Sequence, residues 1–314
     1  MLRLTFLGTS AAQPTIDRNL TALAVRHAGE LLLFDCGEGT QRQMIRFGTG
    51  FDVGAIFFTH FHADHYLGAI GFVRTLAMMG RTDPLDLYGP RPGRKLLETM
   101  LFTGADNFGF EVRITEVSAG EAIARAGCKV HSFATIHRTP SLGWALVEDD
   151  RPGKFNLERA EELGVPRGPL YRELQLGRAV SFDGRTVQPQ EVVGPWRRGR
   201  RVVVSGDTRP CRETTLAATG ADVLVHDSTF GDEELERASE TRHSTAREAA
   251  RIAAQAGVKQ LVLTHLSTRY DREPGTLVAQ AAQEFPGAVA ARDGMVIEVP
   301  LPDGERDGTE PSPP

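Results

Sequence analysis

A nine-residue stretch, Phe57–His65, constrains this chain more than any other part of its sequence. It starts at the end of an apolar run, Ala55–Phe58, that predicts a buried strand. Side-chain direction in an extended segment repeats every two residues, so His60 and His62 can point to the same side. The cluster consists of His60, His62, Asp64 and His65. Packing explains it poorly, because imidazoles that are buried or protonated side by side destabilise a fold. The stretch therefore predicts a site for two nearby cations. Imidazole and carboxylate are ligands of Zn²⁺, with Mn²⁺ or Fe as alternatives.

Length and composition set wider limits. With 314 residues, 40% hydrophobic and 25% charged, the chain can form one large α/β domain or two smaller ones. It has no apolar run of about 18 residues, so we expect no membrane span, and its first residues lack the apolar core of a secretion signal. The three widely spaced cysteines, Cys36, Cys128 and Cys211, suit small buried side chains, and a cytoplasmic location follows by default. A net charge of −5 argues against coating nucleic acid by bulk charge.

Strands and helices alternate in both halves of the chain, which predicts two sheets sandwiched between helical layers. Polar residues recur where the predicted strands end, so several ends can build a site on one edge. These ends follow Phe58, Ile136, Val204, Val225 and Leu263. We also expect a helix over 68–79 with Met78 and Met79 as core filler, and one strand over 288–299.

Residues 149–200 differ in composition from the chain before them. They are rich in Gly, Pro, Arg and Glu, which predicts a protruding insertion. Within 151–178 six residues are basic and four acidic. A solvated helical hairpin explains this slight bias as well as a nucleic-acid contact does.

The pattern His60-Phe61-His62-Ala63-Asp64-His65 resembles the HxHxDH signature of the metallo-β-lactamase superfamily. The resemblance implies an α/β fold, the αβ/βα four-layer sandwich of two mixed sheets flanked by helices. It also implies two metal sites: one held by His60, His62 and His137, the other by Asp64, His65 and His265, with Asp207 bridging both.

Two cations about 4 Å apart lower the pKa of a bridging water and bind both oxygens of an in-line displacement, which suits phosphodiester hydrolysis. Asp64 can both ligate and orient the water and accept its proton. His243 is a candidate for protonating the leaving alkoxide, with the Asp227 carboxylate holding its tautomer. In the alternative interpretation His243 is a neighbour of a helix N-terminus without a chemical role.

Further motifs resemble the ribonuclease Z (tRNase Z) family over nearly all of residues 1–300. They are the loop Pro14-Thr15-Ile16-Asp17-Arg18-Asn19, the turn Asp35-Cys36-Gly37-Glu38-Gly39-Thr40-Gln41, the arm motif Gly164-Val165-Pro166-Arg167-Gly168-Pro169, and the ligand motifs Gly206–Cys211 and Thr264–Tyr270. By this resemblance Arg18 and Asn19 lie near the substrate's 3′ end, Ser267 and Arg269 contact phosphate, and Gly168 and Pro169 belong to a tRNA-gripping arm.

The resemblance implies a zinc-dependent endoribonuclease that removes the 3′ trailer from precursor tRNA and leaves a 3′-hydroxyl. It implies two Zn²⁺ per subunit (Mn²⁺ as an alternative) and a homodimer whose arm serves the partner subunit. We expect one catalytic domain over 1–301 with an inserted flexible arm at about 150–178, and a disordered tail over 302–314.

One motif departs from the family pattern: the usual His-Glu-Ala-Thr appears as His226-Asp227-Ser228-Thr229, with a carboxylate one methylene shorter. Two other functions compete. A small-molecule phosphodiesterase or thioester hydrolase of the same fold would need neither the arm nor the Pro14–Asn19 loop. A non-catalytic RNA-binding or metal-storage module would not need seven ligands and His243.

Overall fold

The computed structural model describes residues 1–104 and 107–302, so all but the first residue of the tail expected over 302–314 lies outside the described residues. The described chain divides into two compact units. The main unit comprises Met1–Val147 and Arg201–Val299, and the second comprises Glu148–Arg200. No described helix has the length and apolar character needed to cross a membrane.

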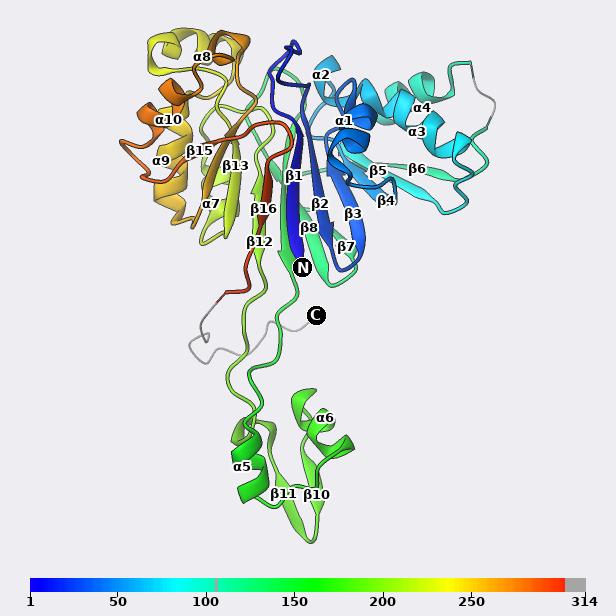
Figure 1. The fold of residues 1–314 in the computed structure, drawn as a ribbon, viewed down its shortest axis with the longest axis vertical. Helices are drawn as coiled ribbons and strands as arrows, with labels where there is room; N and C mark the ends of the chain where they lie inside the picture. The colour runs from blue at the N-terminus through cyan, green and yellow to red at the C-terminus, as the bar shows by residue number, and fades with distance from the viewer. Residues whose placement is uncertain (105–106, 303–314) are drawn as a thin grey trace. The chain divides into compact units, whose positions relative to one another are not determined.

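Two seven-stranded mixed sheets form the main unit (Figure 1). The first has the order β16-β1-β2-β3-β4-β5-β6, with β1 Leu2–Gly8, β2 Ala22–His27, β3 Glu30–Phe34, β4 Val53–Phe57, β5 Leu85–Pro90, β6 Val112–Val117 and β16 Val296–Glu298. The second has the order β15-β14-β13-β12-β9-β8-β7, with β7 Ala122–Arg125, β8 Cys128–Ala134, β9 Leu142–Glu148, β12 Arg201–Val204, β13 Val223–Asp227, β14 Leu261–Thr264 and β15 Val289–Ala290.

The helices of the main unit cover the outer faces of the two sheets (Figure 1). On the first sheet lie α1 Thr40–Phe47, α3 Gly68–Met78 and α4 Arg94–Phe102, and on the second α7 Arg212–Ala218, α9 Ala246–Ala256 and α10 Gly275–Ala281. The short helices α2 Ala63–Tyr66 and α8 Leu235–Thr241 lie in loops beyond strand ends. The predicted four-layer αβ/βα architecture is confirmed.

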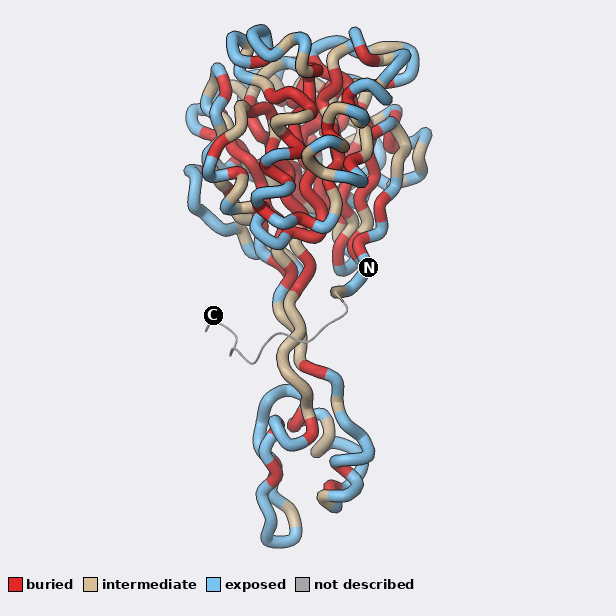
Figure 2. Tube along the Cα trace, turned by 90° about the vertical axis from the view of Figure 1, so that its left-hand side faces the viewer, coloured by how far each residue is buried: buried red, intermediate tan, exposed pale blue. Residues whose placement is uncertain are grey.

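The core between the sheets is apolar and partly aromatic. Phe57 of β4 stacks on Phe34 and Tyr88 of the neighbouring strands, at centroid distances of 5.3 and 5.0 Å. Trp144 of β9 meets Phe57 edge-on from the opposite sheet, at 5.2 Å, and its indole N–H donates to the Phe58 carbonyl at 3.1 Å. This contact fixes the end of β4, immediately before the histidine cluster. Figure 2 shows the buried residues gathered in the interior of the main unit.

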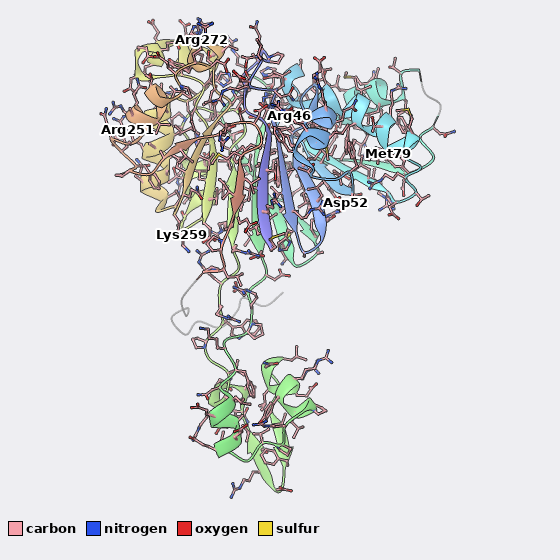
Figure 3. The ribbon with its side chains drawn as sticks, viewed as in Figure 1. Arg46, Asp52, Met79, Arg251, Lys259 and Arg272 are labelled. Atoms are coloured by element: carbon pink, nitrogen blue, oxygen red, sulfur yellow. The ribbon has the colours of Figure 1, made fainter. Side chains whose placement is uncertain are left out.

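Helix α9 illustrates how the sequence determines an outer layer. A capping box of Thr245 and Glu248 starts the helix, and Gly257, with φ 62°, ends it. Its buried face is built largely from alanines, which let it lie close to the second sheet. The opposite face is charged: Arg251, labelled in Figure 3, bonds to Glu284.

Two expectations about local structure were wrong. The strand predicted over 288–299 is two strands, β15 and β16, in different sheets, because Arg292-Asp293-Gly294 turns the chain between them. Met78 and Met79 (Figure 3) are 81% and 62% exposed rather than core filler, because α3 ends there and the chain turns at Gly80. The three cysteines are buried free thiols, as expected, and burial raises the pKa of Cys36 to about 12.

The second unit contains α5 Leu157–Glu162, α6 Pro169–Gln175 and a hairpin of β10 Val180–Phe182 and β11 Arg185–Val187. Its small core includes Ala160, Val165, Leu174, Val180 and Val192. This unit extends further along the chain than the insertion expected at about 150–178.

Candidate metal centre

The seven side chains predicted as metal ligands meet at one edge of the two sheets of the main unit. Each follows the carboxyl end of a strand or lies in the loop after it, which is where sites form in α/β sheets. β4 leads to His60, His62, Asp64 and His65, β8 to His137, β12 to Asp207 and β14 to His265.

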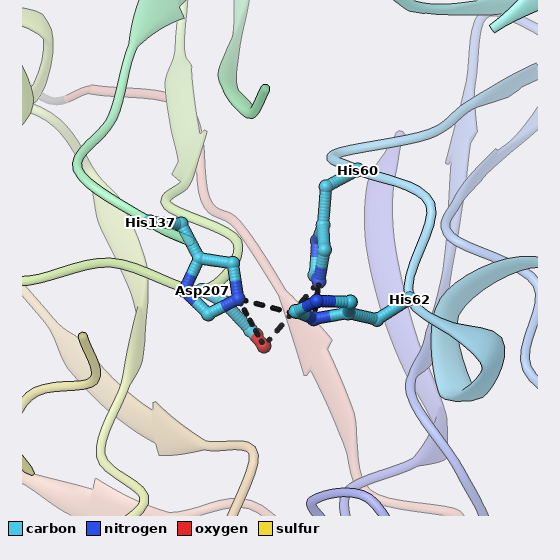
Figure 4. A group of neighbouring side chains, drawn as sticks. All are labelled: His60, His62, His137 and Asp207. Carbon is cyan, nitrogen blue, oxygen red and sulfur yellow. Dashed lines mark hydrogen bonds and ion pairs between the residues drawn. The ribbon is translucent and has the colours of Figure 1, made fainter. Parts of the chain in front are cut away.

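The first group consists of His60, His62, His137 and Asp207 (Figure 4). His62 Nδ1 lies 3.0 Å from His60 Nε2 and 3.1 Å from His137 Nε2. Asp207 Oδ2 lies 3.6 Å from His60 Nε2 and 3.9 Å from His137 Nε2. Ligand atoms about 2.0–2.1 Å from one tetrahedral ion lie roughly 3.3 Å apart, so this group fits such an ion.

The second group consists of Asp64, His65 and His265, with Asp207 at its side. His65 Nε2 lies 3.4 Å from His265 Nε2, and Asp64 Oδ2 lies 3.3 Å from His265 Nε2 and 3.5 Å from His65 Nε2. Asp207 Oδ1 lies 3.4 Å from His65 Nε2, and Asp207 Oδ2 lies 3.4 Å from His265 Nε2. Asp207 therefore reaches both groups. Its buried Oδ1 has no hydrogen-bond partner among the described residues, as expected of an oxygen that faces an ion.

The imidazoles of the two groups differ in their pKa shifts. Burial lowers the pKa of His65, but the Asp207, Asp64 and Asp35 carboxylates outweigh it and raise the pKa well above its usual value, so this imidazole must release a proton when it binds a cation. Burial lowers the pKa of His60, His62 and His137, which keeps these imidazoles neutral. Burial by itself raises the pKa of Asp207, but the neighbouring imidazoles, His265 and His65 foremost, hold it well below its usual value, so the carboxylate is ionised. Neutral imidazoles around an ionised carboxylate are a metal-binding set.

Asp35 orients one histidine of each group. It follows β3 in the left-handed region, with φ 59°, and is buried. Its Oδ2 accepts from His65 Nδ1 at 2.8 Å and from the Thr59 hydroxyl at 2.8 Å. The same hydroxyl lies 3.1 Å from His60 Nδ1. The Nε2 atoms of His60 and His65 are thereby directed toward the other candidate ligands of their groups.

Two further groups orient His137 and His265, and the sequence interpretation missed both. His137 Nδ1 donates to the Arg242 carbonyl at 3.0 Å. His265 Nδ1 donates to the Thr229 hydroxyl at 2.9 Å, which itself donates to Asp227 Oδ1 at 2.7 Å. Thr229 lies two residues after Asp227 in the motif His226–Thr229, and this position was the only feature of the sequence that pointed to a role for it. Arg242 acts through its main chain and gave none.

His243 and Asp227 form a pair beside the second group. His243 Nδ1 lies 2.9 Å from Asp227 Oδ2 and 3.8 Å from Asp207 Oδ2, and its ring stacks on His265 at 5.2 Å. Burial lowers the pKa of His243, but the Asp227 carboxylate outweighs it and raises the pKa to about 9. The shorter aspartate therefore reaches His243 in place of the glutamate usual in the family.

Two family models match the chain: the metallo-β-lactamase superfamily over residues 17–171 and a β-lactamase superfamily domain over 176–266. A ribonuclease Z of Myxococcus xanthus is 58% identical over 305 residues, covering 96% of this chain and 99% of the relative. The chain belongs to the ribonuclease Z family. A ribonuclease Z of Haloferax volcanii is 50% identical over 312 residues, 98% of each chain.

Solved structures agree with this membership in the ribonuclease Z family. Human tRNase Z, short form, superposes with a TM-score of 0.69 and 26% identity, covering 95% of this chain and 100% of that one. A diphosphatase of the PhnP family, at 21% identity and a TM-score of 0.63, shares the fold. The metallo-β-lactamase fold implies divalent metal binding, and the two residue groups fit it.

The residues that the ribonuclease Z resemblance predicts to bind substrate differ from one another in burial and contacts. Arg18 is buried: its guanidinium donates to Thr9 Oγ1 at 2.7 Å and to the Ala291 carbonyl at 2.6 Å, so the structure gives it a role in holding its loop. Asn19 and Ser267 are half-buried and Arg269 is exposed. Gly168 and Pro169 are exposed at the start of α6 in the second unit. Their contacts with substrate stay predictions.

Proposed function

We propose that this protein is an endoribonuclease that removes the 3′ trailer from precursor tRNA and leaves a 3′-hydroxyl, with two Zn²⁺ per subunit and Mn²⁺ as an alternative. One observation carries the proposal: seven metal-binding side chains and the His243–Asp227 pair meet on one edge of a chain that is 58% identical to a ribonuclease Z over nearly its whole length.

The residues divide into two ligand sets joined by a bridge. His60, His62 and His137 would hold the first ion, and Asp64, His65 and His265 would hold the second. Asp207 has one oxygen near each set and serves as the bridge. When bound, such an ion pair lowers the pKa of a water and neutralises charge on the phosphodiester. Nitrogen and carboxylate donors at tetrahedral spacing support Zn²⁺.

The chain's own side chains provide the proton transfers. Asp64 orients the attacking water and accepts its proton through a carboxylate whose pKa lies below its usual value, because His65 and His265 outweigh the effect of burial. His243, held by Asp227 through Nδ1, protonates the leaving 3′-oxygen from its other nitrogen.

The second unit, Glu148–Arg200, is proposed as the arm that grips tRNA. RNA helices are recognised through shape and backbone, which a separate small unit can contact without reading bases. Ten basic and nine acidic residues lie between 148 and 200. Binding of tRNA by this unit therefore depends on where its Arg and Lys side chains lie rather than on its net charge. Gly168, with φ 125°, and Pro169 form an exposed corner that fits the family's arm motif.

The remaining parts of the proposal concern assembly and location. A homodimer, with each arm serving the partner's metal centre, rests on the family resemblance. A cytoplasmic location is supported by the three buried free thiols, which suit a reducing compartment. Sedimentation of the purified protein at several concentrations tests the dimer.

Incubation of the purified protein with a 3′-extended tRNA tests the function. We expect cleavage near the 3′ end of the mature tRNA, a 3′-hydroxyl on the tRNA product, and abolition by a chelator with recovery on adding Zn²⁺. Cleavage of small phosphodiesters without cleavage of the tRNA would favour a small-molecule phosphodiesterase. Binding of tRNA without metal-dependent cleavage would favour an RNA-binding module.

A further inference from the structure

The loop between β1 and β2, residues 9–19, touches two of the three ligand-bearing segments of the second metal group. The Ala12 N–H donates to Asp64 Oδ2 at 2.9 Å, and the same oxygen lies 3.3 Å from His265 Nε2. The loop also pairs with Leu266, the residue after His265: the Ala11 N–H donates to the Leu266 carbonyl at 3.0 Å, and the Leu266 N–H to the Thr9 carbonyl at 2.9 Å. The position of this backbone therefore determines where Asp64 and His265 lie.

The loop does not hold this shape by local preference. Ala12 has φ 55°, in the left-handed region that disfavours residues with a Cβ. The N–H of Ala12 can face Asp64 because contacts elsewhere keep the loop closed. The N–H groups of Thr9 and Ser10 both donate to the Asn19 carbonyl, at 3.0 and 2.9 Å, where the two ends of the loop meet.

Asp293 secures this closure from the turn between β15 and β16. Its Oδ1 accepts from the Thr9 hydroxyl at 2.8 Å, and its Oδ2 accepts from the Asn19 N–H at 2.7 Å. The Gln43 side-chain amide donates to the same Oδ2 at 2.6 Å and also to the Leu7 carbonyl at 2.8 Å, which fixes its orientation. Every partner here is a donor, so the position requires a carboxylate.

We propose that Asp293 is a positioning residue of the metal centre: it closes the 9–19 loop so that Ala12 holds the Asp64 carboxylate and Leu266 holds His265 in the geometry of the second ion. The inference rests on the two-ion centre proposed above. The loop makes no hydrogen bond with His60, His62 or His137 in the described part of the chain, so the first ion is independent of Asp293.

The variant Asp293→Asn tests this directly. Its amide still accepts from Thr9 but turns an NH₂ group toward the Asn19 N–H and the Gln43 amide. We expect the second Zn²⁺ to bind roughly 10–100-fold more weakly, as measured by chelator competition and metal content after dialysis, with the first ion unchanged. The kcat on bis(p-nitrophenyl) phosphate should fall at limiting metal and return with excess Zn²⁺, which a general folding defect would not show.

Asp17→Asn is the matched control, because it makes the same charge change on the exposed part of the same loop and should leave both affinities as in the wild type. Unchanged affinity for the second ion in folded Asp293→Asn, or equal weakening of both ions, would overturn the inference. Should that variant not fold, Thr9→Val removes one donor to Asp293, together with one acceptor of the Arg18 guanidinium, with little change of shape. Wild-type affinity for the second ion in this variant would also overturn the inference. A wild-type protein that binds only one ion would instead refute the two-ion proposal.

Discussion

Replacing Asp227 by asparagine should separate proton delivery from metal chemistry. The carboxylate accepts four hydrogen bonds. Oδ1 accepts from the Thr229 N–H at 3.0 Å and its hydroxyl at 2.7 Å, and Oδ2 accepts from the Thr208 N–H at 3.0 Å and from His243 Nδ1 at 2.9 Å. An amide has one oxygen, so one of these pairs of donors must face an NH₂ group.

The less unfavourable orientation keeps the amide oxygen on Thr229, because that hydroxyl also supports His265. The NH₂ group then faces the Thr208 N–H, which loses its acceptor, and the free energy of unfolding should fall by about 1–3 kcal/mol. It also faces His243 Nδ1, which can no longer donate to a negative charge. Losing a positioned general acid reduces turnover by roughly 10²–10⁴-fold, and we expect a kcat loss in that range on precursor tRNA.

Two substrates with different leaving groups provide the assay. The sugar oxygen released from tRNA needs a proton, whereas p-nitrophenolate from bis(p-nitrophenyl) phosphate leaves as a stable anion. We therefore expect the loss in Asp227→Asn to appear in single-turnover cleavage of tRNA and to be less than about 10-fold on the small diester. His243→Ala should show the same selectivity with unchanged tRNA affinity.

Asp227→Glu is the control that keeps a carboxylate and introduces the family's usual side chain. It should retain tRNA cleavage, although the extra methylene in a buried position costs about 1–3 kcal/mol of stability. Equal losses on the two substrates in Asp227→Asn would refute the proton-delivery reasoning and assign Asp227 to holding the metal centre through Thr229.

Three further predictions concern other parts of the chain. Replacing residues 154–193 by a short linker, between Gly153 and Gly194, should reduce precursor-tRNA cleavage at least ~10-fold but spare the small diester, and equal losses would count against the arm. Trp144→Phe removes the donor to the Phe58 carbonyl and leaves a cavity, so urea denaturation should show a loss of about 2–4 kcal/mol; a change below about 1 kcal/mol would contradict this packing. Removing the metal should lower Tm by roughly 10 °C in calorimetry, and an unchanged Tm would mean that the ions do not stabilise the fold.

The features that could be predicted from sequence are those encoded within a few residues. The spacing of His60, His62, Asp64 and His65 along one short segment predicted a metal site directly, and the structure brings these side chains into two groups that could hold ions. Buried parallel strands such as β12 and β13 appear as short apolar runs followed by polar residues, which predicted the fold class and the strand ends. The grouping of single residues such as His137 and His265 needed the family resemblance, because spacing alone does not relate distant strand ends.

What could not be predicted depends on contacts between distant segments. An apolar run with one short polar interruption looks like a single strand, although β15 and β16 belong to different sheets. The turn between them carries Asp293, whose bond to Thr9 spans 284 residues of sequence. The support that Arg242 gives to His137 uses a main-chain carbonyl, which any residue could supply.

Backbone conformation around the metal centre shows how its geometry is maintained. Six non-glycine residues in the described part of the chain have positive φ, and four of them are at this centre. His265 is one of the proposed ligands, and Asp35, Arg242 and Ala12 contact His65, His137 and Asp64 respectively. Such a conformation costs about 1–2 kcal/mol at an alanine and less at an aspartate. It persists only where the surrounding structure over-determines it, as the two sheets and the Asp293 contacts do here. Contacts within the chain itself therefore maintain the arrangement of these side chains.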